Sequence, residues 1–374
     1  MRVIVVGAGV VGTMHAWHAV NRGHEVVQIE RESEARGASL RNFGQIWVSG
    51  RACGEELDTA LRARELWEGI GRQVPGLGFR ACGSLTPVRG ALELAVAEAA
   101  VARPDAASRG YKLLTPGEAR AVNPALRGDF EAALWCERDA AVEPRTAQLE
   151  LKKALLASGR YTYLGGREVR EVIGDSAVRD DHGDLHTGDT VVLCTGAWLG
   201  GLVRELAGPG LPVRRVRLQM MQTDPLGEDL TTSVADADSF RYYPAYAGEA
   251  LDALNAGQAQ DPTAAEHRMQ LLMVQRRDGG LTIGDTHAYE HPFDFDTVEE
   301  PYEHLTRVAE SFLGRPLPRI RHRWAGVYAQ CTDTSRVVHR QQVRGATWLV
   351  TGPGGRGMTC SPAIAETTAN ELGW

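Results

Sequence analysis

Three glycines near the start of the chain have the spacing of a phosphate-binding turn. In VIVVGAGVVG they are Gly7, Gly9 and Gly12, the G-x-G-x-x-G pattern. In such a turn the first glycine allows the tight bend, the second lets a pyrophosphate approach the backbone, and the third lets the next helix pack closely on the strand. The hexapeptide alone is weak evidence, so the flanking elements must decide.

An acidic residue follows the turn at the distance where it can bind a ribose. RVIVV (2–6) and HEVVQIE (24–30) are typical of buried strands, and the intervening TMHAWHAVNRG is typical of a helix that Gly23 stops. Glu30 ends the second strand, 18 residues after Gly12. The whole unit predicts dinucleotide binding, with phosphates at the helix N-terminus. An acid at Glu30 would repel the 2′-phosphate of NADP, which leaves FAD or NAD.

A second glycine cluster lies near the other end of the chain, in WLVTGPGGRGMTCSPAIAE at positions 352, 354, 355 and 357. Either a tight turn or a ligand against the backbone would require it. Together with TVVLCTGAW (190–198) it repeats the strand, glycine turn and helix of the N-terminus, and this favours FAD over NAD.

Composition excludes several classes of protein. Apolar residues make up 43% and charged residues 24% of 374, as in a soluble globular protein. The net charge of −7 and the lack of a basic tract argue against nucleic-acid binding. No apolar run reaches the roughly 20 residues of a membrane span, and no cleavable signal is evident, so we expect a cytoplasmic protein. The six scattered cysteines favour neither disulfides nor a metal site.

The length predicts two domains in an α/β fold. Helices are expected at 55–74, 91–103 and 298–314, a strand at 239–246, and a mobile surface excursion or a short helix at 247–265. We expect a discontinuous Rossmann-like dinucleotide-binding domain at 1–79, 146–211 and 319–374. A mixed-sheet α+β substrate domain would be inserted at 80–145 and 212–318.

The motifs VIVVGAGVVG, GASLRNFG, VVLCTGAWL, RHRWAGVYAQCTDTSR and VTGPGGRGMTCSPAIAE resemble the FAD-dependent D-amino acid oxidase, glycine oxidase and sarcosine oxidase family over the whole chain. More narrowly, GASLRNFGQIWVSG, RLQMMQT, GDTHAYE and GGRGMTCSPAIAE resemble a subgroup associated with the breakdown of phosphonates such as 2-aminoethylphosphonate.

The resemblance implies where FAD would bind. The N-terminal turn would hold the pyrophosphate, and Glu30 would bind the adenosine ribose. The loop after the second strand would lie beside the pyrophosphate and the flavin. Val169 would contact the adenine through its backbone, and the C-terminal glycines would line the pyrimidine edge of the flavin. Met220, Met221 and Met358 would pack beside the ring. The implied cofactor-binding residues are Gly7, Ala8, Gly9, Val10, Val11, Gly12, Glu30, Arg31, Ser39, Gly44, Gln45, Val169, Thr195, Gly196, Trp198, Gly354, Gly355, Arg356, Gly357, Met358 and Thr359.

Two departures from the family qualify this. The cysteine that bonds covalently to flavin in monomeric sarcosine oxidases is replaced by Gly326, and Cys331 is out of register, so we expect non-covalent FAD. The lysine that promotes reaction with oxygen has no match among Gln275, Arg276 and Arg277. The electron acceptor, oxygen or another, therefore stays open.

An anionic substrate group would require an arginine, whose planar fork matches carboxylate or phosphonate oxygens. Arg41 and Arg356 lie in the loops expected at the flavin, and Arg323 is the third choice, ahead of Arg217 and Arg241. Tyr242, Tyr243 and Tyr328 would form an aromatic lid or pack in the core, and His287 follows a strand end. No general base is assigned, because a dry site near a cation already favours a neutral amine.

The expected activity is FAD-dependent oxidation of a C–N bond in a small amino compound with an anionic tail. The subgroup resemblance favours an aminophosphonate, either 2-aminoethylphosphonate or its N-alkyl derivative. The alternatives are a glycine, sarcosine or D-amino acid oxidase, an FAD-dependent 2-hydroxy acid dehydrogenase, and a non-catalytic flavin- or NAD-binding subunit.

Overall fold

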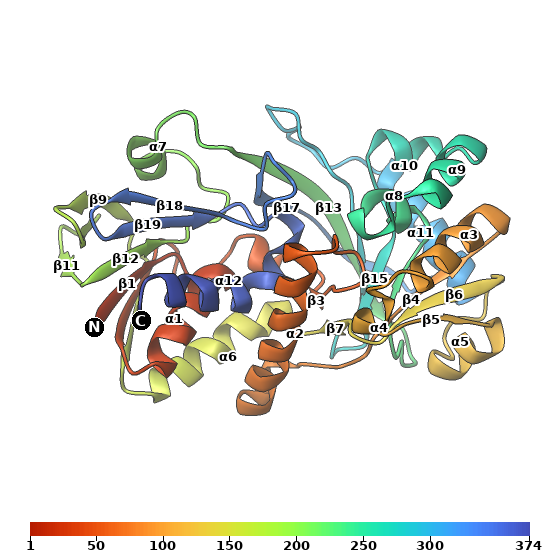
Figure 1. The fold of residues 1–374 in the computed structure, drawn as a ribbon, viewed down its shortest axis with the longest axis horizontal. Coiled ribbons are helices and arrows are strands. Elements are labelled where there is room, and N and C mark those ends of the chain that lie inside the picture. The colour runs from red at the N-terminus through yellow and green to blue at the C-terminus, as the bar shows by residue number, and fades with distance from the viewer.

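The computed structural model describes residues 1–374 and arranges them around two large sheets (Figure 1). A six-stranded sheet lies at the end of the molecule that holds both chain termini, and an eight-stranded sheet lies at the other end. Two long strands, β13 (Val213–Pro225) and β17 (Ile320–Cys331), extend between them. This is the α/β architecture that the sequence predicts.

The six-stranded sheet has the order β18-β19-β12-β1-β2-β8, and every neighbouring pair is parallel except β18–β19. The side chains of Val3, Ile4 and Val5 are fully buried, as in a strand covered on both faces. Helices α1, α6 and α12 pack on one face, and a three-stranded sheet with α7 covers the other. The bounds are β1 Arg2–Val6, α1 Val10–Asn21, β2 Glu25–Glu30, α6 Pro144–Ala157, β8 Tyr161–Gly165, β9 Val169–Ile173, β10 Ala177–Asp180, β11 Leu185–Thr187, β12 Thr190–Leu193, α7 Leu202–Ala207, β18 His339–Arg344, β19 Thr347–Thr351 and α12 Gly357–Glu371.

The eight-stranded sheet has the order β17-β13-β16-β15-β14-β4-β6-β5 and is antiparallel except for the pair β14–β4. Its helices bury two apolar clusters against it. The remaining bounds are β4 Ser84–Val88, α3 Ala91–Val101, β5 Tyr111–Leu114, α5 Pro116–Val122, β6 Ala132–Cys136, β14 Ser233–Ala235, α8 Asp238–Tyr242, α9 Glu249–Gly257, α10 Pro262–Glu266, β15 Leu272–Gln275, β16 Gly280–Gly284 and α11 Glu300–Leu313.

The remaining elements lie outside the two large sheets. None of the helices has both the length and the apolar composition needed to cross a bilayer. Helix α2 (Glu55–Gln73) packs on α12. The others are η1 Ala38–Leu40, β3 Gln45–Ile46, η2 Pro75–Leu77, α4 Ala106–Arg109, β7 Ala140–Ala141, η3 Pro244–Tyr246 and η4 Gly354–Arg356.

One segment differs from the expected secondary structure, and in a second the structure decides between two expectations. Residues 239–246 form α8 and η3 rather than a strand, because Phe240 and Tyr246 pack into an apolar cluster and Pro244 starts the second turn. Residues 247–265, expected as a mobile excursion or a short helix, contain the helices α9 and α10. Leu254 of α9 is fully buried, and the helix packs on α3, so tertiary burial outweighs the polar composition.

The division into two domains remains a proposal, with one adjustment to its boundary. Strand β17, expected in the dinucleotide-binding part, pairs with β13 along the edge of the eight-stranded sheet. A boundary after Cys331 describes this pairing better than one at residue 319.

Candidate active site

A cavity of about 1270 Å³ lies between the two sheets and is lined by residues of both. Its walls include the N-terminal glycine turn, the C-terminal glycine loop (residues 352–357), and side chains of β13, β15 and β17. Pockets for small ligands usually hold about 300–1000 Å³. The larger volume here suits a dinucleotide together with a small second ligand.

The turn that begins α1 is open toward this cavity. A Cβ on Gly7 would lie 2.4 Å from the carbonyl oxygen of Cys194, so only glycine fits there, whereas a Cβ on Gly9 would meet only Ser39 Oγ, at 3.1 Å. The Val10 N–H donates to Ser39 Oγ at 2.8 Å. The next two N–H groups of the helix have no acceptor within the chain, which leaves donors for an anion.

Glu30 lies at the rim of the same turn. Its Oε2 accepts the Ala8 N–H at 2.7 Å, and its Oε1 accepts the Glu32 N–H at 3.1 Å. Both oxygens keep lone pairs for further donors. Nearby, the Arg31 guanidinium carbon lies 4.3 Å from the centre of the Trp198 ring.

Most residues expected at the dinucleotide line the cavity, and three do not. Those that line it include Val10, Val11, Gln45, Val169, Thr195, Gly196 and Trp198. Ala8, Gly12 and Gly44 lie behind the wall. A Cβ on Gly12 would lie 2.1 Å from the Gly7 carbonyl oxygen, and one on Gly44 would lie 2.1 Å from that of Val142. These two glycines therefore permit close backbone packing.

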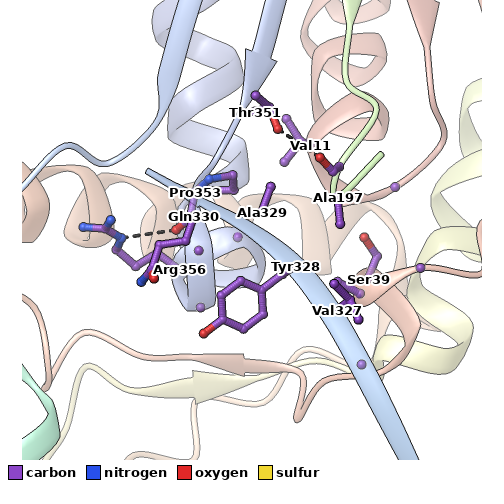
Figure 2. A pocket seen from close by; sticks show the side chains of 18 of the residues that line it. Val11, Ser39, Ala197, Val327, Tyr328, Ala329, Gln330, Thr351, Pro353 and Arg356 are labelled. Atoms are coloured by element: carbon purple, nitrogen blue, oxygen red, sulfur yellow. Dashed lines mark hydrogen bonds between the residues drawn. The ribbon is translucent and has the colours of Figure 1, made fainter. Parts of the chain in front are cut away.

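The C-terminal glycine loop forms the opposite wall, at the start of α12. Gly354, Gly355, Gly357, Met358 and Thr359 line the cavity, and a Cβ on Gly355 would meet only the Tyr328 hydroxyl, at 3.8 Å. Figure 2 shows the Tyr328 ring projecting from β17 into this pocket. The loop leaves room for a flat ligand beside the backbone.

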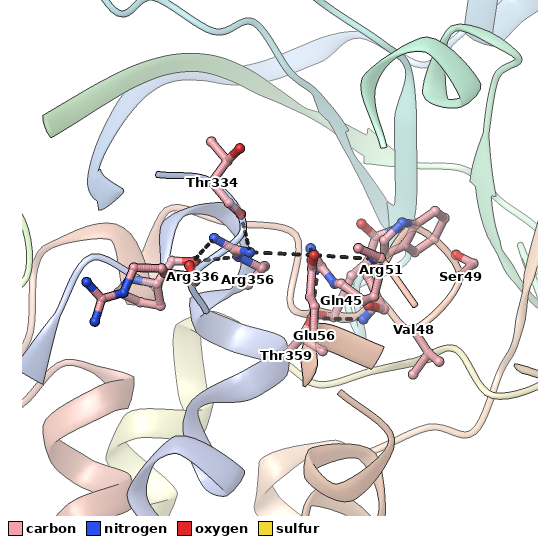
Figure 3. A network of polar contacts seen from close by, with 12 residues as sticks. Gln45, Val48, Ser49, Arg51, Glu56, Thr334, Arg336, Arg356 and Thr359 are labelled. Carbon is pink, nitrogen blue, oxygen red and sulfur yellow. Dashed lines mark hydrogen bonds and ion pairs between the residues drawn. The ribbon is translucent and has the colours of Figure 1, made fainter. Parts of the chain in front are cut away.

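A buried charge cluster supports the loop (Figure 3). One nitrogen each of Arg51 and Arg356 lies 3.5 Å from the Glu56 carboxylate, and all three side chains are buried. Arg356 also donates to the carbonyl oxygens of Thr334 and Arg336, at 3.0 and 2.8 Å. Two guanidiniums share one carboxylate, so the cluster carries a net positive charge. The contacts of Arg356 show that it holds the loop in place.

Aromatic side chains line the part of the cavity next to the eight-stranded sheet. Tyr242 stacks on His287 with ring centres 4.3 Å apart, and Tyr243 packs edge-on against Tyr242 at 5.0 Å. Met220 of β13 also lines the cavity. Met221, expected beside the ring, points instead into the apolar core on the other face of the sheet, because successive side chains of a strand alternate.

The proton of His287 can be placed from its contacts. Its Nδ1 lies 2.9 Å from the carbonyl oxygen of Arg268, and only a protonated nitrogen can donate to a carbonyl. Burial lowers the pKa of His287 to about 4. The ring is therefore neutral at physiological pH, with Nε2 as an acceptor.

The arginines chosen from the sequence are not equally placed. Arg323 is exposed, pairs with Glu299 at 3.0 Å and lies outside the cavity. Arg41 lines the cavity but donates to the carbonyl oxygens of Arg36 and Ala325, both at 3.0 Å. Of the secondary choices, Arg241 lines the cavity but pairs with Asp238 at 3.1 Å.

Arg214 was not among the arginines expected from the sequence, and its surroundings differ from those of Arg41, Arg241 and Arg323. It lines the cavity on the face of the sheet that carries Tyr328, donates to Gln330 Oε1 at 3.1 and 3.3 Å, and has no carboxylate partner. Its guanidinium carbon lies 4.2 Å from the centre of the Tyr289 ring. Its charge is therefore available to an anion in the cavity.

Comparison with known proteins identifies the family. Residues 2–371 match the family described as FAD dependent oxidoreductase. The chain belongs to that family. It is 27% identical to the glycine oxidase of Pseudomonas aeruginosa, over 99% of this chain and 94% of that protein. Crystal structures of glycine oxidase from Bacillus cereus and of L-proline dehydrogenase from P. horikoshii share the fold. The glycine oxidase structure has a TM-score of 0.79 and 17% identity, and the match covers 100% of this chain and 94% of that one. The L-proline dehydrogenase structure also has a TM-score of 0.79, with 21% identity, and the match covers 99% of this chain and 92% of that one.

The protein is thus an FAD-dependent oxidoreductase, and its cavity fits the cofactor. The open face of Gly9, the two free N–H groups of α1, the Glu30 carboxylate and the space beside Gly355 are the features that a pyrophosphate, a ribose and a flavin ring require.

Another cavity residue of this oxidoreductase was missed in the sequence. Asp285 is 6% exposed and follows the end of β16, and its Oδ1 accepts the side-chain N–H of Gln270 at 3.1 Å. Its Oδ2 lies 3.9 Å from His287 Nε2, beyond hydrogen-bond range. Burial raises the pKa of Asp285 to about 8. The available signal was its position in GDTHAYE, at a strand end two residues before His287.

The raised pKa predicts a pH-dependent cost in stability. Below about pH 4 the Asp285 carboxyl is protonated in both states. Between about pH 4 and 8 this carboxyl loses its proton only in the unfolded chain. Because that ionisation stabilises the unfolded chain, the free energy of unfolding falls by about 1.4 kcal/mol per pH unit. We expect Asp285→Asn and wild type to have the same free energy of unfolding near pH 4. As the pH rises to 8, the variant should become increasingly more stable than wild type. Denaturant titrations of both proteins at several pH values would measure this, and parallel curves would contradict it.

Proposed function

We propose that this enzyme oxidises a C–N bond in a small amino compound that carries an anionic tail. The observation that supports this most directly is Arg214, a cavity-lining arginine without a carboxylate partner, close to the glycine loop. A cavity-lining guanidinium without a carboxylate partner is suited to a substrate anion. An oxidase of purely apolar amines would have no use for it.

In the proposed arrangement, FAD spans the cavity from the N-terminal turn to the glycine loop. Gly7 and Gly9 would admit the pyrophosphate beside Ser39, Glu30 would accept hydrogen bonds from the adenosine ribose, and the Val169 backbone would contact adenine. Gly355, Gly357, Met358 and Thr359 would face the pyrimidine edge of the flavin. The N-terminal dipole of α12 and the net charge of the Arg51–Glu56–Arg356 cluster would favour negative charge there.

The bound flavin supplies the electron sink, since it accepts a hydride from the carbon next to the substrate nitrogen. The chain supplies orientation and dryness. Arg214 would fix the anionic tail, and the rings of Tyr242, Tyr243 and Tyr328 would exclude water from the reacting carbon. The imine formed then reacts with water to give an aldehyde and an amine.

Within this class we propose an aminophosphonate, 2-aminoethylphosphonate or its N-alkyl derivative, as the substrate. Support comes from the sequence motifs that resemble the phosphonate subgroup. The second candidate is a small amino acid such as glycine or sarcosine, which the 27% identity to a protein named glycine oxidase favours.

An anaerobic absorbance titration of the purified holoenzyme would test this. N-methyl-2-aminoethylphosphonate, sarcosine, glycine and glycolate would be added separately while the flavin band is followed. Bleaching by the phosphonate alone would support the first candidate, and bleaching by the amino acids the second. Bleaching only by glycolate would indicate a 2-hydroxy acid dehydrogenase, and no bleaching by any compound would indicate a non-catalytic flavoprotein. Admitting air afterwards would test oxygen as the acceptor.

We also expect the FAD to be non-covalent. Gly326 faces Arg41 and Leu218 and offers no nucleophile, and Cys331 is buried outside the cavity wall. Acid precipitation should therefore release all the yellow colour into the supernatant, as measured by its absorbance. Colour retained in the pellet would show a covalent link.

A further inference from the structure

Asp285 is the one acidic side chain of the cavity placed at its aromatic end without a cationic partner. Six acids line the cavity: Glu30, Glu32, Glu56, Glu168, Glu205 and Asp285. Glu56 is shared by two arginines, and the other four glutamates come from segments around the dinucleotide end. Asp285 has one amide donor, on Oδ1, and its Oδ2 accepts no hydrogen bond.

Rings surround this carboxylate. Burial first, and the nearby Asp285 carboxylate second, raise the pKa of Tyr243 and of Tyr328. Burial is also the largest cause of the raised pKa values of Tyr242 and Tyr289, and the Asp285 carboxylate raises them further. The Tyr328 hydroxyl has no hydrogen-bond partner within the chain. A carboxylate among aromatic faces is an environment that binds ammonium groups, because both the charge and the ring quadrupoles attract a cation.

Arg214 and Asp285 both lie near the Tyr289 ring. Arg214 packs over Tyr289 with its guanidinium carbon 4.2 Å from the ring centre, and His287, which lies beside Asp285, has its ring centre 6.4 Å from that of Tyr289. A small molecule with an anion at one end and an ammonium at the other could pair its anion with Arg214 and its ammonium with Asp285.

We propose that Asp285 binds the amino group of the substrate through Oδ2 and accepts the proton that this group must lose. The role rests on the proposed amine oxidation. In solution the amine is an ammonium ion, which has no lone pair to form a C=N bond. Transfer of one N–H proton to Oδ2 breaks that N–H bond, forms an O–H bond and frees the lone pair. Loss of the C–H hydrogen as a hydride, which carries the electron pair of that bond to the oxidised flavin, would then let the nitrogen lone pair form the C=N bond.

Asp285 is also the group at this end whose charge changes in the neutral range. Of the titratable groups that face it, His287 has a pKa of about 4, and Tyr242, Tyr243, Tyr289 and Tyr328 all have pKa values raised above the ordinary tyrosine value. The pKa of Asp285 itself is about 8. A rate that rises with pH near 8 would therefore report this carboxyl.

Rapid mixing of the anaerobic holoenzyme with N-methyl-2-aminoethylphosphonate, and separately with sarcosine, would test the proposal. The rate of flavin reduction and the Kd of the amine would be measured from pH 6 to 10. For wild type we expect the rate of flavin reduction divided by Kd to rise through about pH 8. For Asp285→Asn we expect the rate of flavin reduction divided by Kd to fall by about 100-fold at pH 7.5, which is typical of removing a positioned base. Its increase with pH should shift to the higher pH at which the amine itself loses a proton.

Two further variants separate this role from a structural one. Asp285→Glu keeps a carboxyl and should retain the limb near pH 8 with a weaker Kd. Asp236→Asn removes another buried acid that lies outside the cavity, and its rate and pH profile should be those of wild type. FAD content and the free energy of unfolding would be measured for each, because D285N should be at least as stable as wild type at pH 7.5.

The outcomes are distinguishable. D285N that reduces its flavin within about threefold of wild type and with the same pH profile overturns the role of Asp285, while amine oxidation stands. Wild-type flavin that neither amine reduces overturns the proposed function, and the role of Asp285 falls with it.

Discussion

Alanine at Gly9 is expected to weaken FAD binding strongly while leaving the chain folded. The backbone at Gly9 has φ −64° and ψ 172°, which any residue adopts, and a Cβ there would meet only the Ser39 hydroxyl, at 3.1 Å. The fold should therefore accept the methyl group. The pyrophosphate should not, because the methyl group occupies the space through which phosphate oxygens reach the N–H groups of α1.

We expect the affinity of Gly9→Ala for FAD to fall by about 100-fold or more, since charge-assisted hydrogen bonds are lost. Fluorescence titration of the apoprotein with FAD would measure it, with circular dichroism to confirm folding. The matched control is Gly12→Ala, whose Cβ would lie 2.1 Å from the Gly7 carbonyl oxygen. It should cost about 3 kcal/mol or more of stability. Normal FAD affinity in G9A would show that the pyrophosphate lies elsewhere.

Methionine at Arg214 is expected to lower kcat/KM for an anionic amine by about 100-fold. Methionine keeps an unbranched side chain on the wall beside Tyr289 and removes the guanidinium. Loss of one partner from a hydrogen-bonded charge pair costs about 2–5 kcal/mol, and 100-fold corresponds to about 3 kcal/mol. Steady-state kinetics with the amine that bleaches the flavin would measure this.

Two controls make the result specific to the anion. Arg217 lies on the other face of β13, outside the cavity, and donates to the Asp296 carbonyl oxygen at 2.7 Å. Arg217→Met should therefore leave kcat/KM unchanged. An amine without an anionic group should also be oxidised equally by wild type and R214M. An equal loss for charged and uncharged amines would mean that Arg214 supports the wall and binds no anion.

Local sequence determined the dinucleotide-binding end of this enzyme. The strand, glycine turn, helix and acid from Arg2 to Glu30 are contiguous, and each is specified by neighbouring residues: β-branched side chains, the Gly7 turn and the 18-residue spacing to Glu30. The C-terminal glycine loop is equally local. For these segments the sequence was sufficient, and the structure agrees that Gly12 permits close backbone packing. Outside them, it adds that Gly44 serves backbone packing rather than lining the cavity.

The substrate end could not be read in the same way. Residues 239–246 carry aromatic residues that favour a strand, yet they form a helix because tertiary contacts bury Phe240 and Tyr246. An arginine in a strand is ordinarily a surface residue, and nothing local distinguishes Arg214 from Arg217. Only the pairing of β13 with β17 turns Arg214 toward Tyr328 and the cavity.

The same reason governs the charged groups of the site. Arg356 was identifiable as a loop residue, but its engagement by Glu56 and two carbonyl groups depends on residues about 300 and 20 positions away. The unpaired state of Asp285 depends on what its neighbours bind. Sequence by itself determined the fold class and the strand, glycine turn and helix at each end of the chain, because these follow from contiguous residues. The motifs' resemblance to a flavoenzyme family indicated FAD. Only the tertiary structure decided which charges face the cavity without a partner, because pairing and burial are properties of contacts between distant segments.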